Sequence, residues 1–304
     1  MSSTLPSVAE LRRVAAATWP ERKLRHFRVV EGGWANLVLE ADDELIFRFP
    51  RRIEVARALG FEVRILDYLS RRISTPVPVP LRIGTLERPE GWPYLVYRKI
   101  CGLPLNEYRA LDRTERARLR KFLTRLLEEL AELPPTPLRR LGCQPGDPKA
   151  WRELYVRLLH RYERVGASKV SPEMDRNIRA RFDAFLSSLA RSHYHPVLSH
   201  RDLGSYNILW DPEKGQPSGI LDWEDTRLGD PAFDLVGLLP FDASFGRPLR
   251  RMRKSSTDLE FDQRLGFYRA IRFLPELLHG IQTHRPKLVR QKLRELQGDL
   301  ERRS

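Results

Sequence analysis

The stretch LSHRDLGSYNILWDPEKGQPSGILDWEDTRLGDPAFDL, residues 198–235, decides what fold and what chemistry the chain can have. It places Asp202 and Asn207 in one short segment and Asp222 after a second apolar run. The two apolar runs flank a turn, which predicts a hairpin of two short strands with Asn207 and Asp222 at the same end. Two carboxylates and an amide at these spacings form the oxygen-rich set that a magnesium-nucleotide site needs.

The spacing suggests a role for each of these side chains. Asp202 is the candidate base that accepts a hydroxyl proton, and Asn207 and Asp222 are the candidate magnesium ligands. His200 is better interpreted as a packing residue of the loop, because phosphoryl transfer needs mainly positioning and charge neutralisation. A P-loop and a serine hydrolase are excluded, since the chain contains neither G-x-x-x-x-G-K-[ST] nor G-x-S-x-G.

The end of the stretch predicts supporting structure rather than chemistry. Gly229, Asp230 and Pro231 are typical of a helix start, with Asp230 as the cap and Pro231 in the first turn. Asp234 follows closely, and we expect it to brace the loop that carries Asp202.

The first hundred residues predict a small antiparallel sheet with one main helix. Helical spacing from Ile53 to Ser70 predicts that helix, and a capping-box pattern from Ser7 to Glu10 predicts a short helix before the sheet. The expected strands are five extended runs bounded by turn-forming residues and prolines, at residues 27–31, 35–40, 45–49, 81–85 and 94–97.

Four residues of this region are candidates for phosphate binding. Gly32 and Gly33, between two expected strands, would let the backbone approach a phosphate, although such a pair is more often only a turn. Arg48 lies in an apolar strand and needs a partner, because burying a lone cation is costly. Glu62, on the apolar face of the following helix, is a candidate partner, and the alternative is that it lies at the rim.

A connector at residues 100–104 separates this region from a mainly helical remainder. We therefore expect an N-terminal lobe at residues 1–99 and a C-terminal lobe at residues 100–304. Leucine and aromatic stripes predict helices within residues 112–133, 151–162 and 178–189, and a basic helical tail follows from residue 250. The predicted fold class is α+β.

Composition limits the classes of partner. The 54 Lys and Arg residues against 40 Asp and Glu give a net charge of +14, which favours anionic partners, although a solvated arginine-rich surface is the simpler explanation. Cys101 and Cys143 lack a metal-ligand spacing, and no apolar run approaches the length of a membrane span. We expect a cytoplasmic protein, a monomer rather than an oligomer, with no membrane contact.

The motifs H-R-D-L-G-S-Y-N, I-L-D-W-E-D and G-D-P-A-F-D-L resemble those of the aminoglycoside phosphotransferases, a family of protein-kinase-like small-molecule kinases. In the N-terminal region, F-R-V-V-E-G-G-W-A-N-L-V-L and L-I-F-R-F-P-R-R resemble the aminoglycoside 2″-phosphotransferase and macrolide phosphotransferase branch. The resemblance covers roughly residues 27–235. It implies a bilobal protein-kinase-like fold, ATP or GTP as phosphate donor, Mg2+, and phosphate transfer to a hydroxyl.

The resemblance also implies roles for individual residues. Arg48 and Glu62 would be the phosphate-positioning pair, with Arg48 standing where many relatives have Lys. Asp202 would be the catalytic base, and Asn207 and Asp222 would be the magnesium ligands. The purine would lie against the hinge segment that leads into the connector, and the resemblance implies Val96, Tyr97, Lys99 and Ile100 as its contacts.

The acceptor stays open between several alternatives. An aminoglycoside, which is polycationic, would need carboxylates, and Asp242 and Glu276 are the candidates, yet arginines surround them. A macrolide or another hydroxylated metabolite is the alternative acceptor. A kinase-like nucleotide-binding protein with little turnover, or a basic protein that docks on nucleic acid, is the alternative class. The intact set of Asp202, Asn207 and Asp222 argues against the former, and the lack of a nucleic-acid-binding motif argues against the latter.

Overall fold

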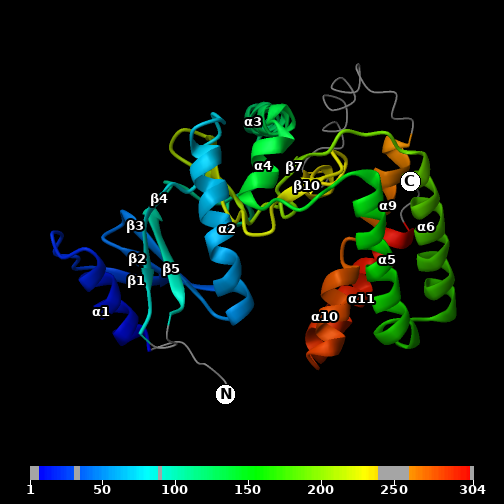
Figure 1. The fold of residues 1–304 in the computed structure, drawn as a ribbon, viewed down its shortest axis with the longest axis horizontal. Helices are drawn as coiled ribbons and strands as arrows, with labels where there is room; N and C mark the ends of the chain where they lie inside the picture. Colours follow the sequence, from blue (N-terminus) through cyan, green and yellow to red (C-terminus); the bar gives the residue numbers. More distant parts are fainter. Residues whose placement is uncertain (1–6, 31–34, 88–90, 239–259, 302–304) are drawn as a thin grey trace. The chain divides into compact units, whose positions relative to one another are not determined.

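Five extended runs in the first hundred residues form one antiparallel sheet, in the order β1-β2-β3-β5-β4 (Figure 1). The computed structural model describes residues 7–30, 35–87, 91–238 and 260–301. The strands of this sheet are β1 (Phe27–Val30), β2 (Asn36–Ala41), β3 (Leu45–Pro50), β4 (Pro80–Thr85) and β5 (Pro93–Arg98). All five match the runs expected from the sequence.

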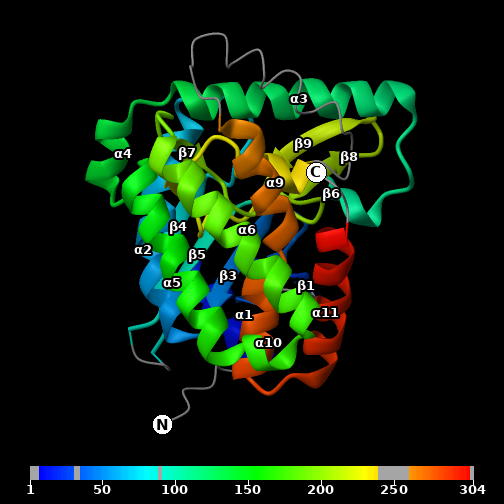
Figure 2. The same cartoon turned by 90° about the vertical axis from the view of Figure 1, so that its right-hand side faces the viewer.

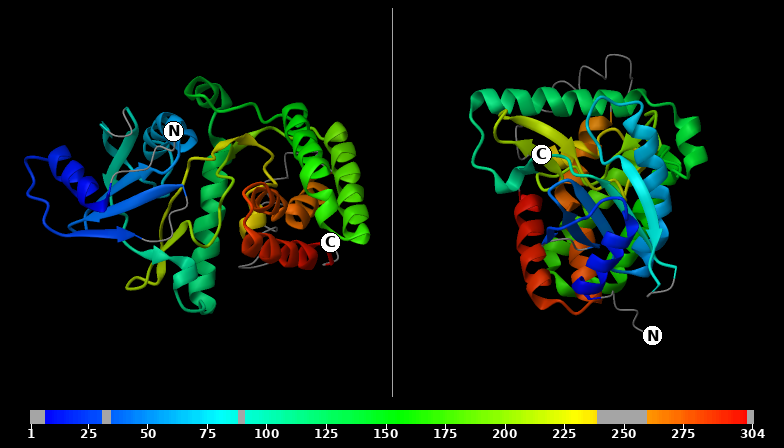
Figure 3. Two further views of the ribbon diagram at one scale, coloured as in Figure 1. Left: turned by 90° about the horizontal axis from the view of Figure 1, so that it is seen from below. Right: turned by 90° about the vertical axis from the view of Figure 1, so that its left-hand side faces the viewer.

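Two helices cover opposite faces of this sheet, α1 (Val8–Thr18) and α2 (Ile53–Ser70) (Figure 3). The period of two along β3 turns Phe47 and Phe49 toward the core that they share with Leu11 of α1. Arg48, between them, points to the other face, where it meets α2. Burying each large apolar side chain contributes about 1.5–3 kcal/mol, so β3 is fixed in register and Arg48 with it.

Helix starts follow the local sequence. Ser7 and Glu10 form the expected capping box of α1, with Glu10 N donating to Ser7 Oγ over 3.3 Å and Ser7 N donating to Glu10 Oε2 over 2.8 Å. Asp112 and Glu115 form the same reciprocal arrangement at the start of α3 (Arg113–Glu132), with distances of 2.8 and 2.9 Å. Both caps satisfy amide groups that would otherwise lack partners in the first helical turn.

The hairpin expected within residues 198–235 is present as β8 (Ile208–Asp211) and β9 (Gln216–Ile220). A short strand, β6 (Leu103–Pro104), pairs with β8, so the expected connector is partly a strand. A 3-10 turn, η1 (Leu105–Glu107), follows it. These strands form a second small sheet.

The chain divides into two compact units, and the division passes through α3 and α4 (Pro135–Leu141). The first unit comprises residues 1–129, 140–142 and 204–226, and the second comprises residues 130–139, 143–203 and 227–304. The first unit therefore contains the β8–β9 hairpin as well as the five-stranded sheet. The expected lobe boundary after residue 99 stays a prediction.

The second unit is mainly helical (Figure 2). An aromatic cluster joins three of its helices: the ring centroids of Tyr155 and Phe185 are 4.9 Å apart, and Phe185 stacks on Phe267 at 3.8 Å. Two short strands, β7 (Val197–Ser199) and β10 (Arg227–Gly229), pair antiparallel. The helical elements are α5 (Pro148–Val165), η2 (Ala167–Lys169), α6 (Pro172–Arg191), α7 (Leu235–Leu238), α9 (Phe261–Ile271), α10 (Leu274–Gln282) and α11 (Pro286–Glu301).

One expected element is wrong. The pattern at Gly229, Asp230 and Pro231 predicts a helix start, but the chain forms a turn there and the next helix, α7, begins at Leu235. The reason is that the Asp230 carboxylate, besides accepting from Ala232 N at 2.9 Å, is engaged by Arg264 of α9. The fold class, α+β with a small antiparallel sheet, is as expected. No helix in the described part of the chain is both long and apolar enough to cross a membrane.

Candidate active site

Arg48 and Glu62 form a buried ion pair within the first unit. Arg48 Nη1 lies 2.5 Å from Glu62 Oε1, and the two side chains are 7% and 1% exposed. Burial is the largest single influence on the pKa of Arg48 and would lower it, but the neighbouring acidic groups, Glu62 first among them, together hold this pKa above its ordinary value. The guanidinium is therefore a permanent cation, fixed between β3 and α2.

The second arm of Arg48 reaches two carboxylates that follow β9. Arg48 Nη2 lies 3.3 Å from Glu224 Oε2 and 3.6 Å from Asp222 Oδ1. Asn36, at the start of β2, also donates to Glu224 Oε2 through Nδ2 over 3.4 Å. Burial, and next the negative charge of Asp222, raise the pKa of Glu224 to about 7.

Glu224 is a contact of Arg48 that the sequence did not reveal. It stands two positions after Asp222 in I-L-D-W-E-D, where an acid is equally typical of a surface turn. Its contact with Arg48 joins residues 176 positions apart, so no local pattern could predict it.

Asn207 and Asp222 are held at the same end of the β8–β9 hairpin. Leu221 N donates to Asn207 O over 2.8 Å, and Ile208 pairs with Ile220 in the ladder. Asp222 has a left-handed backbone, with φ of 64°. Such a conformation costs about 1–3 kcal/mol for a residue with a side chain and persists only where the surroundings enforce it. The hairpin thus holds the two candidate magnesium ligands beside neighbouring strand ends, Asn207 just before β8 and Asp222 just after β9.

The expected purine-binding segment lies against this hairpin. A Cβ atom on Gly219 of β9 would lie 2.9 Å from Ile100 Cγ2 and 3.0 Å from Pro76 O, so a larger residue there would displace its neighbours. Val96 is buried in the core beneath α1, and burial raises the pKa of Tyr97 to about 12. Lys99 is already paired, with Nζ 2.7 Å from Asp43 Oδ1 and 3.0 Å from Glu40 Oε1.

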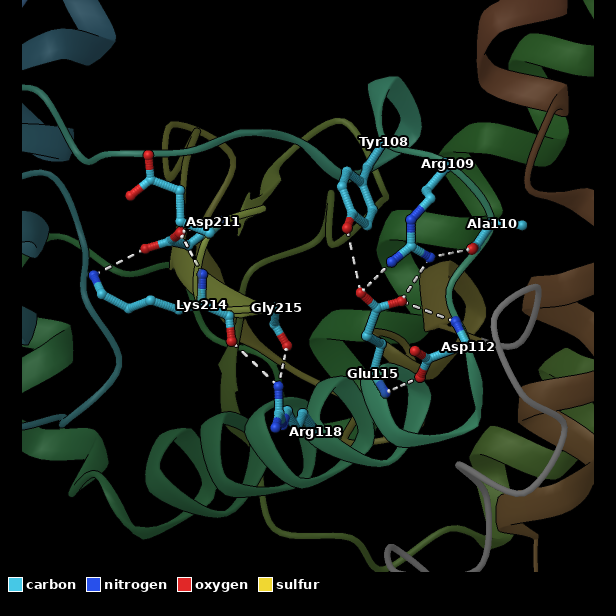
Figure 4. Close-up of polar contacts among 10 residues, drawn as sticks. Tyr108, Arg109, Ala110, Asp112, Glu115, Arg118, Asp211, Lys214 and Gly215 are labelled. Atoms are coloured by element: carbon cyan, nitrogen blue, oxygen red, sulfur yellow. Dashed lines mark hydrogen bonds and ion pairs between the residues drawn. The ribbon is translucent and has the colours of Figure 1, made fainter.

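Helix α3 supports the turn of the hairpin (Figure 4). Arg118 Nη1 donates to the carbonyl oxygens of Gly215 at 2.9 Å and Lys214 at 3.2 Å. Lys214 Nζ in turn lies 2.9 Å from Asp211 Oδ2. These bonds tie the far end of β8 and β9 to the helix.

The start of α3 is held by a second polar cluster (Figure 4). Arg109 binds both oxygens of the Glu115 carboxylate, at 2.8 and 3.0 Å, and Tyr108 Oη donates to Glu115 at 3.2 Å. The ring of Tyr108 lies 5.6 Å from that of Trp210 on β8. The segment that follows η1 is therefore fixed both to α3 and to the hairpin.

Asp202 belongs to a loop of the second unit that Asp234 organises. The Asp234 carboxylate accepts hydrogen bonds of 2.8 Å each from Ser199 Oγ, His200 N and Arg201 N. Asp202 N donates to His200 Nδ1 over 3.2 Å, and His200 is fully buried. His200 and Asp234 therefore set the backbone on which Asp202 sits.

Arg201, next to Asp202, has a left-handed backbone with φ of 72°. Its guanidinium lies over the rings of Phe233 and Trp151, at 5.3 and 5.8 Å from the ring centroids. The side chain is thus held by aromatic rings while its amide is held by Asp234. A left-handed backbone at a residue with a side chain persists only where the surrounding contacts enforce it, so these contacts hold the loop that carries Asp202 in one conformation.

Asp230 anchors the same segment from the opposite direction. It forms a bidentate pair with Arg264, at 2.5 and 3.1 Å, and both side chains are fully buried. Tyr268 Oη donates to Asp230 Oδ2 over 2.6 Å, and Trp151 Nε1 donates to Tyr268 Oη over 2.6 Å. Arg264 also donates to Ser192 Oγ over 2.8 Å. The network joins α5, α9 and the turn after β10.

The donor set of the hairpin suits magnesium. Asn207 offers an amide oxygen and Asp222 a carboxylate, both hard ligands, and magnesium bound with phosphates needs only one or two protein carboxylates. Within the described ranges, no three His, Cys, Asp or Glu side chains are grouped as a metal-binding site of their own. The residues therefore fit a metal shared with a nucleotide rather than a closed structural site.

Four of the expected residues do not join these clusters. Gly32, Gly33 and Asp242 lie outside the described residues. Glu276, on α10, lies 2.8 Å from Lys292 Nζ of α11. Its expected part in acceptor binding stays a prediction.

The fold is that of a protein-kinase-like enzyme. Residues 26–275 match the model of the phosphotransferase enzyme family, so the chain belongs to this family. The family expected from the motifs is thereby confirmed.

Individual relatives place the chain more closely. Viomycin phosphotransferase of Streptomyces vinaceus is 30% identical over 206 residues, a match that spans 66% of this chain and only 64% of that protein. The GDP complex of aminoglycoside 2'-phosphotransferase-IIIa has the same fold, with a TM-score of 0.85, 21% identity, and 97% and 99% of the two chains covered. A macrolide 2'-phosphotransferase from Brachybacterium faecium also has this fold, with a TM-score of 0.71 and 21% identity. The match covers 93% of this chain and 97% of that chain.

Proposed function

We propose that this protein transfers the γ-phosphate of ATP or GTP to a hydroxyl of an aminoglycoside-like antibiotic. The observation that carries the proposal is the contact of one buried cation, Arg48, with both Glu62 and Asp222. A fixed cation beside a candidate metal ligand is what positioning of nucleotide phosphates requires. Family membership supports the reaction class.

The reaction assigns each residue one task. The acceptor hydroxyl oxygen attacks the γ-phosphorus, the bond to the β-phosphate oxygen breaks, and the nucleoside diphosphate leaves. Asp202 accepts the hydroxyl proton, while Arg48 holds the phosphates through charge and hydrogen bonds. His200 and Asp234 keep the Asp202 backbone in place.

Asn207 and Asp222 would hold Mg2+ through their oxygens. The ion, when bound, neutralises phosphate charge that would otherwise oppose attack. Their fixed place at one end of the hairpin supports this assignment. Gly32 and Gly33 would approach the phosphates, and the segment that includes Val96, Tyr97, Lys99 and Ile100 would receive the purine.

Two observations bear on the acceptor: the relatives favour an antibiotic, whereas the net positive charge of the chain disfavours a polycationic one. The relatives are phosphotransferases of viomycin, aminoglycosides and macrolides, which supports an antibiotic hydroxyl as the acceptor. The net charge of +14 disfavours strongly polycationic acceptors. A macrolide or another hydroxylated metabolite is therefore the alternative acceptor, and Asp242 and Glu276 are the candidate contacts for a cationic one.

One panel experiment tests the function. The purified protein is incubated with Mg2+, either ATP or GTP, and each of an aminoglycoside, viomycin, a macrolide and a small amino alcohol. Phosphorylated product is detected by mass spectrometry. We expect product with at least one antibiotic and none without nucleotide. Nucleotide binding with no product from any acceptor would favour the alternative of a kinase-like protein with little turnover.

A further inference from the structure

Tyr206 holds an aromatic ring in a fixed place next to a candidate magnesium ligand. It lies in the turn of residues 204–207, which Asn207 N closes by donating to Gly204 O over 3.0 Å. A Cβ atom on Gly204 would lie only 2.7 Å from Tyr206 Cε1, so the ring rests against the backbone of this glycine. The residue is nonetheless 52% exposed. The turn thus supports the ring, while about half of the side chain stays open to solutes.

An acidic residue of the same unit lies near this ring. Strand β6 pairs antiparallel with β8, and the same register, continued by three residues into η1, brings Glu107 level with Tyr206. The two segments stay together beyond the strands, because Asn106 N donates to Ser205 O over 3.3 Å. Since neighbouring Cα atoms are about 3.8 Å apart, this bond keeps the Cα atoms of Glu107 and Tyr206 within about 11 Å of each other.

The carboxylate of Glu107 is available to a ligand. The residue is exposed and forms no ion pair with any other residue in the described part of the chain. The next cation along the segment, Arg109, is instead held by both oxygens of Glu115, at 2.8 and 3.0 Å (Figure 4). The basic residue closest to Glu107 in the sequence therefore does not neutralise it.

A ring and a carboxylate in this arrangement suit a protonated amine. An ammonium group is attracted both by the face of an aromatic ring and by a negative charge. A ring that the turn already supports loses little freedom when the ligand binds. In the sequence, Tyr206 follows the candidate base Asp202 by four residues and immediately precedes Asn207. A group held at Tyr206 is thus close to the candidate metal ligand, where the proposed reaction needs its acceptor.

We propose that Tyr206 and Glu107 bind a protonated amine of the acceptor and so select amine-bearing hydroxyl compounds as substrates. The inference rests on the proposed function, because it concerns the acceptor of that reaction. It explains how a chain with a net charge of +14 can take a cationic acceptor, since the ring and the carboxylate supply a local attraction. These two side chains bind the acceptor alone and leave the nucleotide to other residues.

Direct binding of acceptors tests this. Calorimetry on the full chain with kanamycin, viomycin and erythromycin, each of which carries an amine, identifies the compound that the parent protein binds most tightly. Its dissociation constant is then measured for Glu107→Gln, Tyr206→Ala and Tyr206→Phe. We expect the first two variants to bind it about three- to fivefold more weakly, as for exposed cation–π contacts and ion pairs. Tyr206→Phe keeps the ring and should bind like the parent.

Controls keep the outcomes distinct. Glu128→Gln removes an exposed carboxylate from α3 and should bind the acceptor like the parent. Thermal unfolding and nucleotide affinity should stay at the parent values in every variant, which a merely structural role of Tyr206 would not allow.

The outcomes separate this inference from the proposed function. Product from the parent, with acceptor affinity unchanged in Glu107→Gln and Tyr206→Ala, would overturn the inference and leave the proposed function standing. Weakened acceptor binding in both variants, without product from the parent, would overturn the proposed function alone. A parent that binds none of the three compounds would overturn both.

Discussion

Arg48 of β3 and Glu62 of α2 are joined by an ion pair of 2.5 Å that is almost completely removed from solvent. At this point α2 contacts β3 through an ion pair rather than through apolar side chains. Removing water from two charges is costly, and their attraction compensates only while both partners remain. The pair therefore fixes a cation in the sheet and makes each partner depend on the other.

Loss of the Glu62 charge should destabilise the protein. We expect Glu62→Gln to lower the free energy of unfolding by about 3 kcal/mol, because Arg48 keeps its charge and loses its buried partner. Urea denaturation followed by circular dichroism measures this. Glu54→Gln, at an exposed position of the same helix, should change the value by less than about 1 kcal/mol. Equal effects of the two substitutions would contradict the energetic role of the pair.

The pair between Asp230 and Arg264 should matter as much, since both side chains are fully buried. Arg264→Met removes the cation and leaves the Asp230 carboxylate with Tyr268 and Ala232 N as donors. We expect a loss of about 3–5 kcal/mol in the free energy of unfolding. Gln263→Met, at the neighbouring exposed position of α9, is the control. A loss for Arg264→Met no larger than that of the control would show that the buried pair adds nothing to stability.

Asp234 should affect turnover more than nucleotide binding. Asp234→Asn removes the charge that accepts from Ser199 Oγ, His200 N and Arg201 N, and one amide group cannot accept all three bonds equally well. The strained backbone at Arg201 should then relax and displace Asp202. We expect kcat to fall about 10²-fold, as for other small misplacements of a reacting group, while the Kd for nucleotide stays near that of the parent. Asp183→Asn, on the exposed side of α6, should leave both constants unchanged.

Asp222 should set the magnesium requirement. Asn tolerates the left-handed conformation found at this position, so Asp222→Asn changes the ligand charge without adding backbone strain. We expect the Mg2+ concentration for half-maximal turnover to rise by at least about tenfold, as for other weakened metal sites. Asp183→Asn, at an exposed position of α6, is the control. An unchanged Mg2+ requirement in Asp222→Asn would remove Asp222 from the ligand set.

Patterns within a few residues predicted much of the fold. Extended runs between turn-forming residues predicted the five strands of the first sheet, and the Ser7–Glu10 capping-box pattern predicted the start of α1. The Arg48–Glu62 pair could be predicted as a candidate from the sequence, because a charged residue in an apolar strand and another on an apolar helix face each need a partner.

What the sequence missed depends on contacts between distant segments. Glu224 gains its place only through Arg48 and Asn36, which lie far away in the chain. Asp230 looks like a helix cap locally, yet Arg264 engages its carboxylate and the helix begins later. Leu103 and Pro104 look like a connector, because their pairing with Trp210 and Leu209 leaves no local pattern.

The most direct test of the account is the rate of phosphorylated product formed by Asp202→Asn with the best acceptor and nucleotide. We expect the rate to fall about 10²–10⁴-fold, the contribution typical of a general base, with nucleotide affinity and thermal stability close to those of the parent. Asp183→Asn should react like the parent. A variant at Asp202 that turns over as fast as the parent would contradict the assignment of Asp202 as the base.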